Sequence, residues 1–297
     1  MALLLTATFF MIHLVPGDPV RAALGPAAPA DLVAQRRADL GLDDPLTTQF
    51  ATYVRHVVHG DLGTSLFTGE KITDVIKARL PSTLQLAGLA FLTAILVAIP
   101  LGVLMAALTH GGRNRSGELA FTASAGLFAS IPAFLLGVGL VWIFAVSLEW
   151  LPVAGRAGPS SYILPVAALA IAPAAALARI VRVEGLRVLD QDYMRTARGK
   201  RLPRRHVYLR HALPNTLTAT LTLAGLLLGG LIAGTVLVEQ IFAWPGLGTT
   251  LVQSVTQKDF PAVQGLALLF GTFVLLINFA VDIVLGAIDP RSTILER

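Results

Sequence analysis

Few side chains in this sequence have the type and spacing that catalysis or metal binding requires. His56 and His59 stand three residues apart and could share one helix face, as paired metal ligands do. No third ligand stands near them, so packed or solvated histidines are the favoured interpretation and no metal site is predicted. The segment GGRNRSGE from Gly111 lacks the spacing and the lysine of a phosphate-binding loop, and neither H-E-x-x-H nor G-x-S-x-G occurs. The sequence therefore predicts that this chain alone is not an enzyme.

Positive charge is concentrated in residues 184–215, between two long apolar runs. The basic residues in this segment and just before it are Arg182, Arg187, Arg195, Arg198, Lys200, Arg201, Arg204, Arg205 and Arg210. Only Glu184, Asp190 and Asp192 oppose them. Such an excess beside apolar runs marks the cytoplasmic face of a membrane protein. From charge alone, the segment could set the membrane topology without binding a partner protein.

Within this segment, residues 193–202 (YMRTARGKRL) are predicted to form a short helix that ends at Pro203. Ala197 and Gly199 are small, and small residues allow a helix to approach another surface closely. A second amphipathic turn is expected before Pro214. A short helix at a membrane face suits docking into a groove on another protein.

The composition is that of an integral membrane protein. Of the 297 residues, 55% are hydrophobic and only 14% are charged, whereas a soluble domain carries about 25% charged residues. The absence of cysteine excludes disulfides and thiolate metal sites. A net charge of +5 could suggest nucleic acid, but the basic residues gather beside apolar runs, so membrane lipid is the predicted partner and nucleic acid is not.

Six apolar runs are predicted to cross the membrane. The first, residues 1–16, is too short for a full span, and we expect that its start is missing. Residues 17–80 form a water-soluble loop region with two short helices, at 30–40 and 45–58, and residues 81–288 form the membrane domain. The remaining spans are predicted at residues 82–108, 119–148 (with a kink at Pro132), 162–178, 216–238 and 260–286, before a tail at 289–297.

The distribution of basic residues orients these spans. Of the 23 lysines and arginines, 14 fall in segments that a six-span topology places inside, and seven of the other nine lie in the long first loop, where the positive-inside rule is weak. Both termini are therefore predicted to be cytoplasmic.

The basic segment resembles the cytoplasmic signature of the inner-membrane permeases of ATP-binding-cassette (ABC) importers, in particular the oligopeptide and dipeptide group and the first permease of each pair. That signature is Glu-Ala-Ala, three residues, Gly, nine residues, Ile-x-Leu-Pro, and in the peptide branch it drifts to Tyr-Val-Arg-Thr-Ala-Arg-Ala-Lys-Gly-Leu. Here residues 195–197 (Arg-Thr-Ala) stand at the first triplet and residues 213–214 (Leu-Pro) at the expected distance. The sequence departs from the signature at Arg201, which replaces the glycine, and at His211, which replaces the isoleucine.

Four further stretches are similar to elements of this family and extend the resemblance over nearly the whole chain. They are LVPGDP at residues 14–19, DLGTS at 61–65, EQIFAWPGLG at 239–248 and DPR at 289–291.

The resemblance implies an all-α integral membrane protein of the type I importer permease fold, with six transmembrane helices and a helical extracytoplasmic loop after the first. It implies a bacterial inner-membrane importer of peptides that works by alternating access. Its partners would be a second permease, two cytoplasmic ATPase subunits that hold ATP and Mg, and an external substrate-binding protein, while this chain itself holds no cofactor. The residues expected to contact the ATPases are Asp192, Tyr193, Met194, Arg195, Thr196, Ala197, Arg198, Gly199, Lys200, Leu202 and Pro203.

Asp282 is the one formal charge inside a predicted span. An ionisable residue there usually faces a bundle interior or water. It could line a translocation path with Asn278; the favoured alternative is solvation near the cytoplasm or a pair with an arginine of the basic segment. Glu239 and Gln240, at the outer end of the fifth span, are further candidates for the path entrance.

Two alternatives remain open. Related permeases carry nickel chelates or haem, and an external binding protein would largely decide the substrate. A secondary transporter driven by an ion gradient is a hypothesis of another class, which would favour charged residues at midplane and internal repeats.

Overall fold

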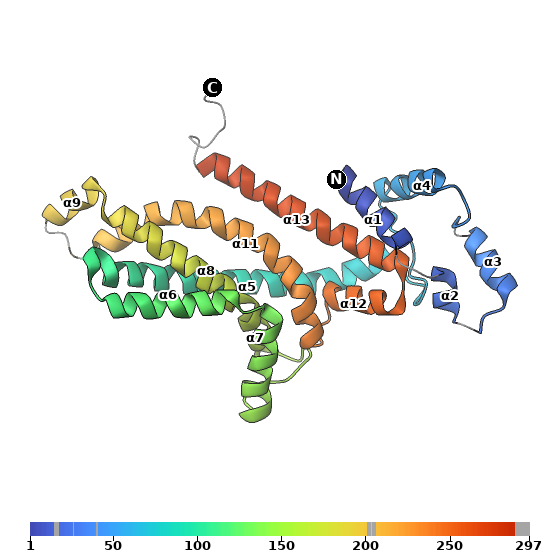
Figure 1. The fold of residues 1–297 in the computed structure, drawn as a ribbon, viewed down its shortest axis with the longest axis horizontal. Coiled ribbons are helices and arrows are strands. Elements are labelled where there is room, and N and C mark those ends of the chain that lie inside the picture. Colours follow the sequence, from blue (N-terminus) through green and yellow to red (C-terminus); the bar gives the residue numbers. More distant parts are fainter. Residues whose placement is uncertain (15–17, 26, 40, 201–202, 204–205, 289–297) are drawn as a thin grey trace, which may run out of the picture.

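The computed structural model describes residues 1–14, 18–25, 27–39, 41–200, 203 and 206–288, which form an elongated helical molecule (Figure 1). No β-strand occurs in these residues; one isolated bridge joins Thr64 and Lys71. The prediction of an all-α protein is confirmed. The α-helices are α1 Ala2–Leu14, α2 Pro19–Leu24, α3 Ala30–Asp39, α4 Leu46–Val58, α5 Ile72–Thr109, α6 Arg115–Ser130, α7 Ala133–Leu140, α8 Ile163–Leu189, α9 Asp192–Gly199, α11 Leu213–Ile241, α12 Leu247–Gln257 and α13 Phe260–Ile288.

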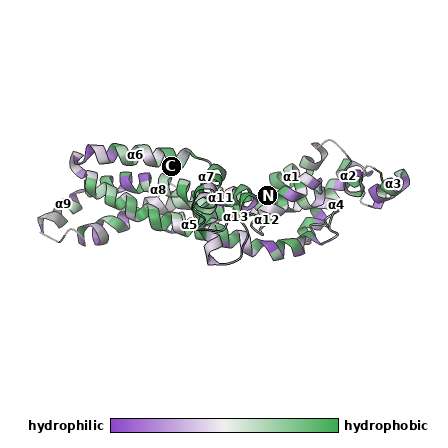
Figure 2. Cartoon of the chain, turned by 90° about the horizontal axis from the view of Figure 1, so that it is seen from below, coloured by the Kyte–Doolittle hydropathy of each residue, from purple (hydrophilic) through white to green (hydrophobic). Residues whose placement is uncertain are grey.

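In the described part of the chain, four helices are long and apolar enough to cross a membrane. These spans are Ile72–Gly112, Pro159–Leu189, Ala224–Ile241 and Phe260–Val281. Hydrophobic residues predominate on α5 and α8, whereas α3 is more hydrophilic (Figure 2). The helix α1 contributes a shorter apolar stretch, Ala2–Met11. The pair Arg115–Ser130 and Ala133–Ser147 would be a further span if the two helices cross together. The count of six spans stays a prediction.

The predicted span at 119–148 is not one kinked helix, because the chain bends by 98° between α6 and the helix that follows. Pro132 disfavours the helical conformation of the residue before it. Ile131 accordingly has extended dihedrals, φ −81° and ψ 123°, and ends α6. The new helix starts at Ala133 and continues as a π-helical segment, Val141–Ser147. Figure 1 shows α7 projecting away from the bundle.

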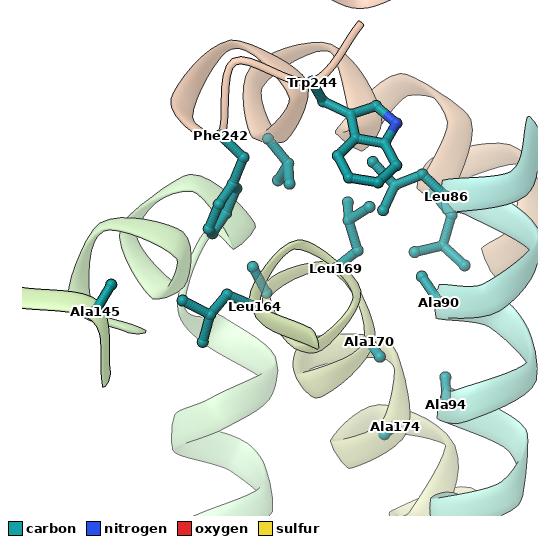
Figure 3. Packing of buried hydrophobic residues seen from close by; sticks show 13 residues of the cluster. Leu86, Ala90, Ala94, Ala145, Leu164, Leu169, Ala170, Ala174, Phe242 and Trp244 are labelled. Atoms are coloured by element: carbon teal, nitrogen blue, oxygen red, sulfur yellow. The ribbon is translucent and has the colours of Figure 1, made fainter. Parts of the chain in front are cut away.

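The main core lies between α5, α8 and the end of α11 (Figure 3). Small side chains on α5 and α8, among them Ala90, Ala94 and Ala170, let the two helices approach closely. Phe242 and Trp244 come from the turn after α11 and cover this cluster. The two helices also lie close together at Gly102, where an added Cβ atom would stand 2.5 Å from Cβ of Val181.

The segment before α5 gathers at the end of the molecule opposite α9 (Figure 1). The two helices predicted at 30–40 and 45–58 are present as α3 and α4, and a further short helix, α2, was not predicted. Tyr53 of α4 hydrogen-bonds the hydroxyl of Thr8 on α1 at 2.9 Å. His56 lies within α4 and His59 is its C-cap residue, whose Nδ1 lies 2.7 Å from the carbonyl oxygen of Arg55.

Candidate functional site

The short helix predicted in the basic segment is present as α9, between α8 and a π-helical turn, Val207–Ala212, that leads into α11. It ends at Gly199, before the predicted end at Leu202, and Lys200 lies in the turn that follows. Glycine is a poor helix former, so an end at this residue is expected. Arg201 and Leu202 lie outside the described residues.

One face of α9 is buried. Met194 has no exposed surface and packs in a cluster with the end of α8, the π-helical turn and α5; the cluster consists of Ala106, Val188, Leu189, Met194, Val207 and Ala212. Ala197, three residues later on the same face, is also buried. This cluster fixes α9 to the ends of three long helical segments.

The other face of α9 is open. Tyr193 is 44% exposed, and Asp192, Thr196, Gly199, Lys200 and Pro203 are exposed as well. Arg195 and Arg198 belong to the helix, but their side chains lie outside the described residues. The expected contact residues therefore divide into an open face and a buried face that holds Met194 and Ala197.

The basic segment begins as helix, because α8 continues to Leu189, well past the predicted end of its span at residue 178. Arg182 is buried on this extension, and its Nη2 lies 2.7 Å from Oε1 of Glu118 at the start of α6. Its Nε donates to Oγ1 of Thr109, at the end of α5, at 3.1 Å. Arg182 thus joins α5, α6 and α8 beside α9. The charge excess identifies Arg182 only as a cytoplasmic residue. The signal for its structural role is its position between Val181 and Gly185, two residues of α8 that lie against α5.

Glu239, a predicted path residue, is fully buried near the end of α11. Its Oε2 accepts hydrogen bonds from the backbone N–H groups of Gly248, at 2.7 Å, and Thr249, at 3.3 Å, in the first turn of α12. The carboxylate thereby satisfies N–H groups that have no partner within α12. A side chain at Gly246 would overlap this carboxylate, and one at Gly248 would reach within 2.5 Å of Cα of Val236. The segment EQIFAWPGLG therefore forms a turn closed by its own first residue.

Replacing Glu239 with alanine should loosen this turn. Two buried N–H groups would lose their acceptor, which we expect to reduce the free energy of unfolding by about 2 kcal/mol. The melting temperature in detergent micelles, together with protease cleavage after Phe242 or Trp244, measures the effect. The neighbouring exposed residue supplies the control: Gln240→Ala should leave both readouts unchanged. Equal behaviour of the two variants would contradict the role of the carboxylate.

The other path candidates are spread over two helices. Gln240 is exposed at the end of α11. Asn278 on α13 faces Gly229 of α11, where an added Cβ would stand 3.4 Å from its Oδ1. Asp282 lies in α13, but its side chain is outside the described residues. The structure thus places Asn278 between the two helices and does not bring it together with Glu239.

The family described as "Binding-protein-dependent transport system inner membrane component" matches residues 98–294, and its N-terminal counterpart matches residues 1–87. The chain belongs to this family. It is an ABC importer permease, as the resemblance implied. The glutathione transport system permease protein GsiC of Salmonella paratyphi A is 41% identical to this permease over 283 residues, which are 95% of this chain and 91% of that protein. The corresponding protein of Pectobacterium atrosepticum is 40% identical over 288 residues, 97% of this chain and 93% of that protein.

Solved structures confirm the fold of this permease. A chain of the MetNI methionine ABC transporter, in an inward facing conformation, aligns with a TM-score of 0.57 at 19% identity, over 73% of this chain and 97% of that chain. A chain of an amino acid ABC transporter aligns with a TM-score of 0.54 at 18% identity, over 72% of this chain and 94% of that one. The predicted type I importer permease fold is therefore correct.

Proposed function

We propose that this permease imports short peptides such as glutathione and that it pairs with a second, distinct permease to enclose the path. The observation that carries the proposal is the 41% identity with glutathione permeases over 95% of the chain. In this proposal two ATPase subunits, which bind ATP and Mg, dock at the α9 end of the molecule. An external binding protein delivers the substrate at the opposite end, and both termini are cytoplasmic.

The packing of α9 supports its role as the coupling element. Met194 anchors the helix on α8 and on the turn that leads into α11, so a push on α9 moves both helices together. Arg182 and Glu118 extend the connection to α6. ATP binding would close the ATPases, displace α9 as a rigid element and switch the permeases from inward-facing to outward-facing. Hydrolysis would reset them.

The open face of α9, with Tyr193 and Thr196, is the proposed contact surface for an ATPase. We place Arg195, Arg198 and Lys200 in the same contact because arginine and lysine bind carboxylates and helix C-termini at protein surfaces. Met194 and Ala197 serve as anchors instead.

The translocation path is proposed to run along α11 and α13, near Gln240, Asn278 and Asp282. Glu239 could reach it only if α12 moved, because its carboxylate is bound to the backbone of Gly248 and Thr249. Asn278 is the best supported of these residues, since it lies where the two helices meet at Gly229.

Reversing two charges on α9 tests the coupling contact. Arg195→Glu combined with Arg198→Glu should lower peptide uptake at least tenfold and release the ATPases, because four units of charge change at the contact and about 1.4 kcal/mol corresponds to each tenfold change. Affinity purification of the chain from its native membrane, with identification of the bound subunits, is the measurement.

The matched control is Arg113→Glu combined with Arg115→Glu, which makes the same charge change just before α6 and at its first residue. This variant should keep its partners. Intact ATPase association and uptake in the α9 variant would disprove the contact. A solitary wild-type protein that moves solute without ATP would disprove the whole importer assembly proposed here.

Uptake by the reconstituted complex tests the substrate. Proteoliposomes that hold the permease pair and the ATPases, supplied with binding protein and ATP, should accumulate labelled glutathione. Accumulation of a nickel chelate or haem without glutathione would assign the chain to another substrate class.

A further inference from the structure

Arg156 lies in the turn between the π-helical segment and α8, and its guanidinium group is held entirely by neutral acceptors. Its Nε donates to the hydroxyl of Tyr162 at 2.7 Å, Nη1 to Oγ of Ser82 at 2.9 Å and Nη2 to Oε1 of Gln85 at 2.7 Å. None of the ion pairs found among the described residues includes Arg156. The positive charge is therefore fixed in place without a carboxylate beside it.

The groups that hold Arg156 are themselves fixed. Trp244 is fully buried, its Nε1 donates to the carbonyl of Ser82 at 3.2 Å, and the guanidinium carbon stands 5.8 Å from its ring centroid. The same carbon stands 5.7 Å from the ring centroid of Tyr162. The turn is tied to the end of α11 by a hydrogen bond from Gly155 N–H to the carbonyl of Phe242 at 2.8 Å. A side chain held in this way loses little freedom when it binds a ligand.

The guanidinium group of Arg156 has N–H groups beyond those used in these three hydrogen bonds. A guanidinium group carries five N–H bonds in a planar fork, and the three contacts above use three of them. The two that remain belong to Nη1 and Nη2, one on each nitrogen. Each of these N–H groups can donate a charge-assisted hydrogen bond to a carboxylate oxygen.

An open hollow of about 730 Å³ adjoins the guanidinium group, lined by Gln85, Leu89, Pro159 and Tyr162 among others. Leu89 gives it an apolar wall next to the charge. The site lies at the start of α8, and α9 follows the other end of this 27-residue helix, which at 1.5 Å per residue is about 40 Å away. It is therefore at the end of the permease where, in the proposed function, the substrate enters.

We propose that Arg156 binds a free carboxylate of the imported peptide at the mouth of the path opposite α9. This inference rests on the proposed import of short peptides. The hollow receives the substrate, Arg156 binds one carboxylate, and Leu89 contacts the neighbouring apolar part. A lipid phosphate could use the same donors, but the partners of Arg156 come from α5, the start of α8 and the buried tryptophan after α11, which favours a ligand at the helix bundle itself.

The test compares the effect of a mutation on substrates that differ by one carboxylate. The complete importer in proteoliposomes is supplied with binding protein and ATP, and initial uptake is measured for glutathione and for its two monoamides, each of which lacks one carboxylate. Arg156→Gln should lower the uptake of glutathione and of one monoamide about tenfold, the effect expected for a charge-assisted contact. It should leave the other monoamide within about twofold, because that compound lacks the carboxylate that Arg156 binds. Arg156→Lys, which keeps the charge without the fork, should show the same dependence with a smaller loss.

Each other outcome overturns the inference in an identifiable way. An equal loss for all three compounds would show that Arg156 only holds the turn against α5 and does not bind a substrate carboxylate. A loss that changes with lipid headgroup, between phosphatidylcholine vesicles and vesicles that contain phosphatidylglycerol, would assign the donors to a lipid phosphate. Failure of the wild-type importer to carry any of the three would disprove peptide import, and the carboxylate subsite with it.

Discussion

Replacing Met194 with aspartate should uncouple this permease from its proposed ATPase subunits and lower uptake at least tenfold. Met194 has no exposed surface and fills the apolar cluster beneath α9. A charge placed there without a partner costs about 3 kcal/mol or more. The eight-residue helix α9 can leave the cluster, which exposes the charge to water. This local change requires less free energy than unfolding of the membrane helices. The measurement is the ratio of peptide uptake to ATP hydrolysis in proteoliposomes, which should fall while the chain still inserts.

Met194→Leu is the matched control, since it keeps an apolar side chain of similar volume and should keep at least about half of the uptake. A global loss of protein from the membrane, rather than a fall in that ratio, would show that the cluster stabilises the whole fold and not the position of α9. Unchanged uptake in the aspartate variant would exclude the buried face of α9 from coupling.

Replacing Gly102 with leucine should have the largest effect on stability. A Cβ atom at this position would stand 2.5 Å from Cβ of Val181 and 2.7 Å from the carbonyl oxygen of Ala178, so α5 and α8 would have to separate. Overpacking of this kind costs about 3 kcal/mol or more, which lowers the melting temperature in detergent by about 5 °C or more for a chain of this size.

The same helix offers the control, because a Cβ atom built at Gly88 would have no atom within 4 Å other than those of its chain neighbours and the adjacent helix backbone. Gly88→Leu adds the same side chain to α5 and should leave the melting temperature within about 2 °C, or raise it, since leucine is the better helix former. Equal destabilisation of the two variants would show that the approach of α5 and α8 at Gly102 does not limit stability.

Much of the fold could be predicted because a membrane imposes simple constraints on sequence. Apolar runs predicted α5, α8, α11 and α13, and turn residues predicted the two helices of the soluble region. Pro132 was recognised, but its effect was underestimated as a kink. A proline allows several bend angles, and only the packing of the following helix selects the bend of 98°. The extension of α8 to Leu189 was also missed, because charged residues in a helix beyond the membrane resemble those of a loop.

The candidate site was predicted as a segment but not as a surface. The pattern of YMRTARGKRL predicts a helix and its contact residues, but only the cluster around Met194 separates the anchors from the open face. The path residues Glu239, Gln240, Asn278 and Asp282 stay predictions. The buried carboxylate of Glu239 shows why sequence is a weak guide there: its bonds to Gly248 and Thr249 depend on a turn between two helices.

The sequence by itself determined that this chain is a helical membrane protein, and its motifs determined the family, because hydrophobicity and short-range spacing are local properties of the chain. The tertiary structure decided which charges are partnered. Arg182 and Arg156 look alike in the sequence, as basic residues beside apolar spans. Folding brings Glu118 to Arg182, so that Arg182 links α8 to α6. Among the residues that the structure describes, folding brings only neutral acceptors to Arg156. The two arginines differ because of contacts to Ser82 and Glu118, which lie more than 60 positions away in the sequence. The energy of a charged side chain depends on the groups that folding brings next to it.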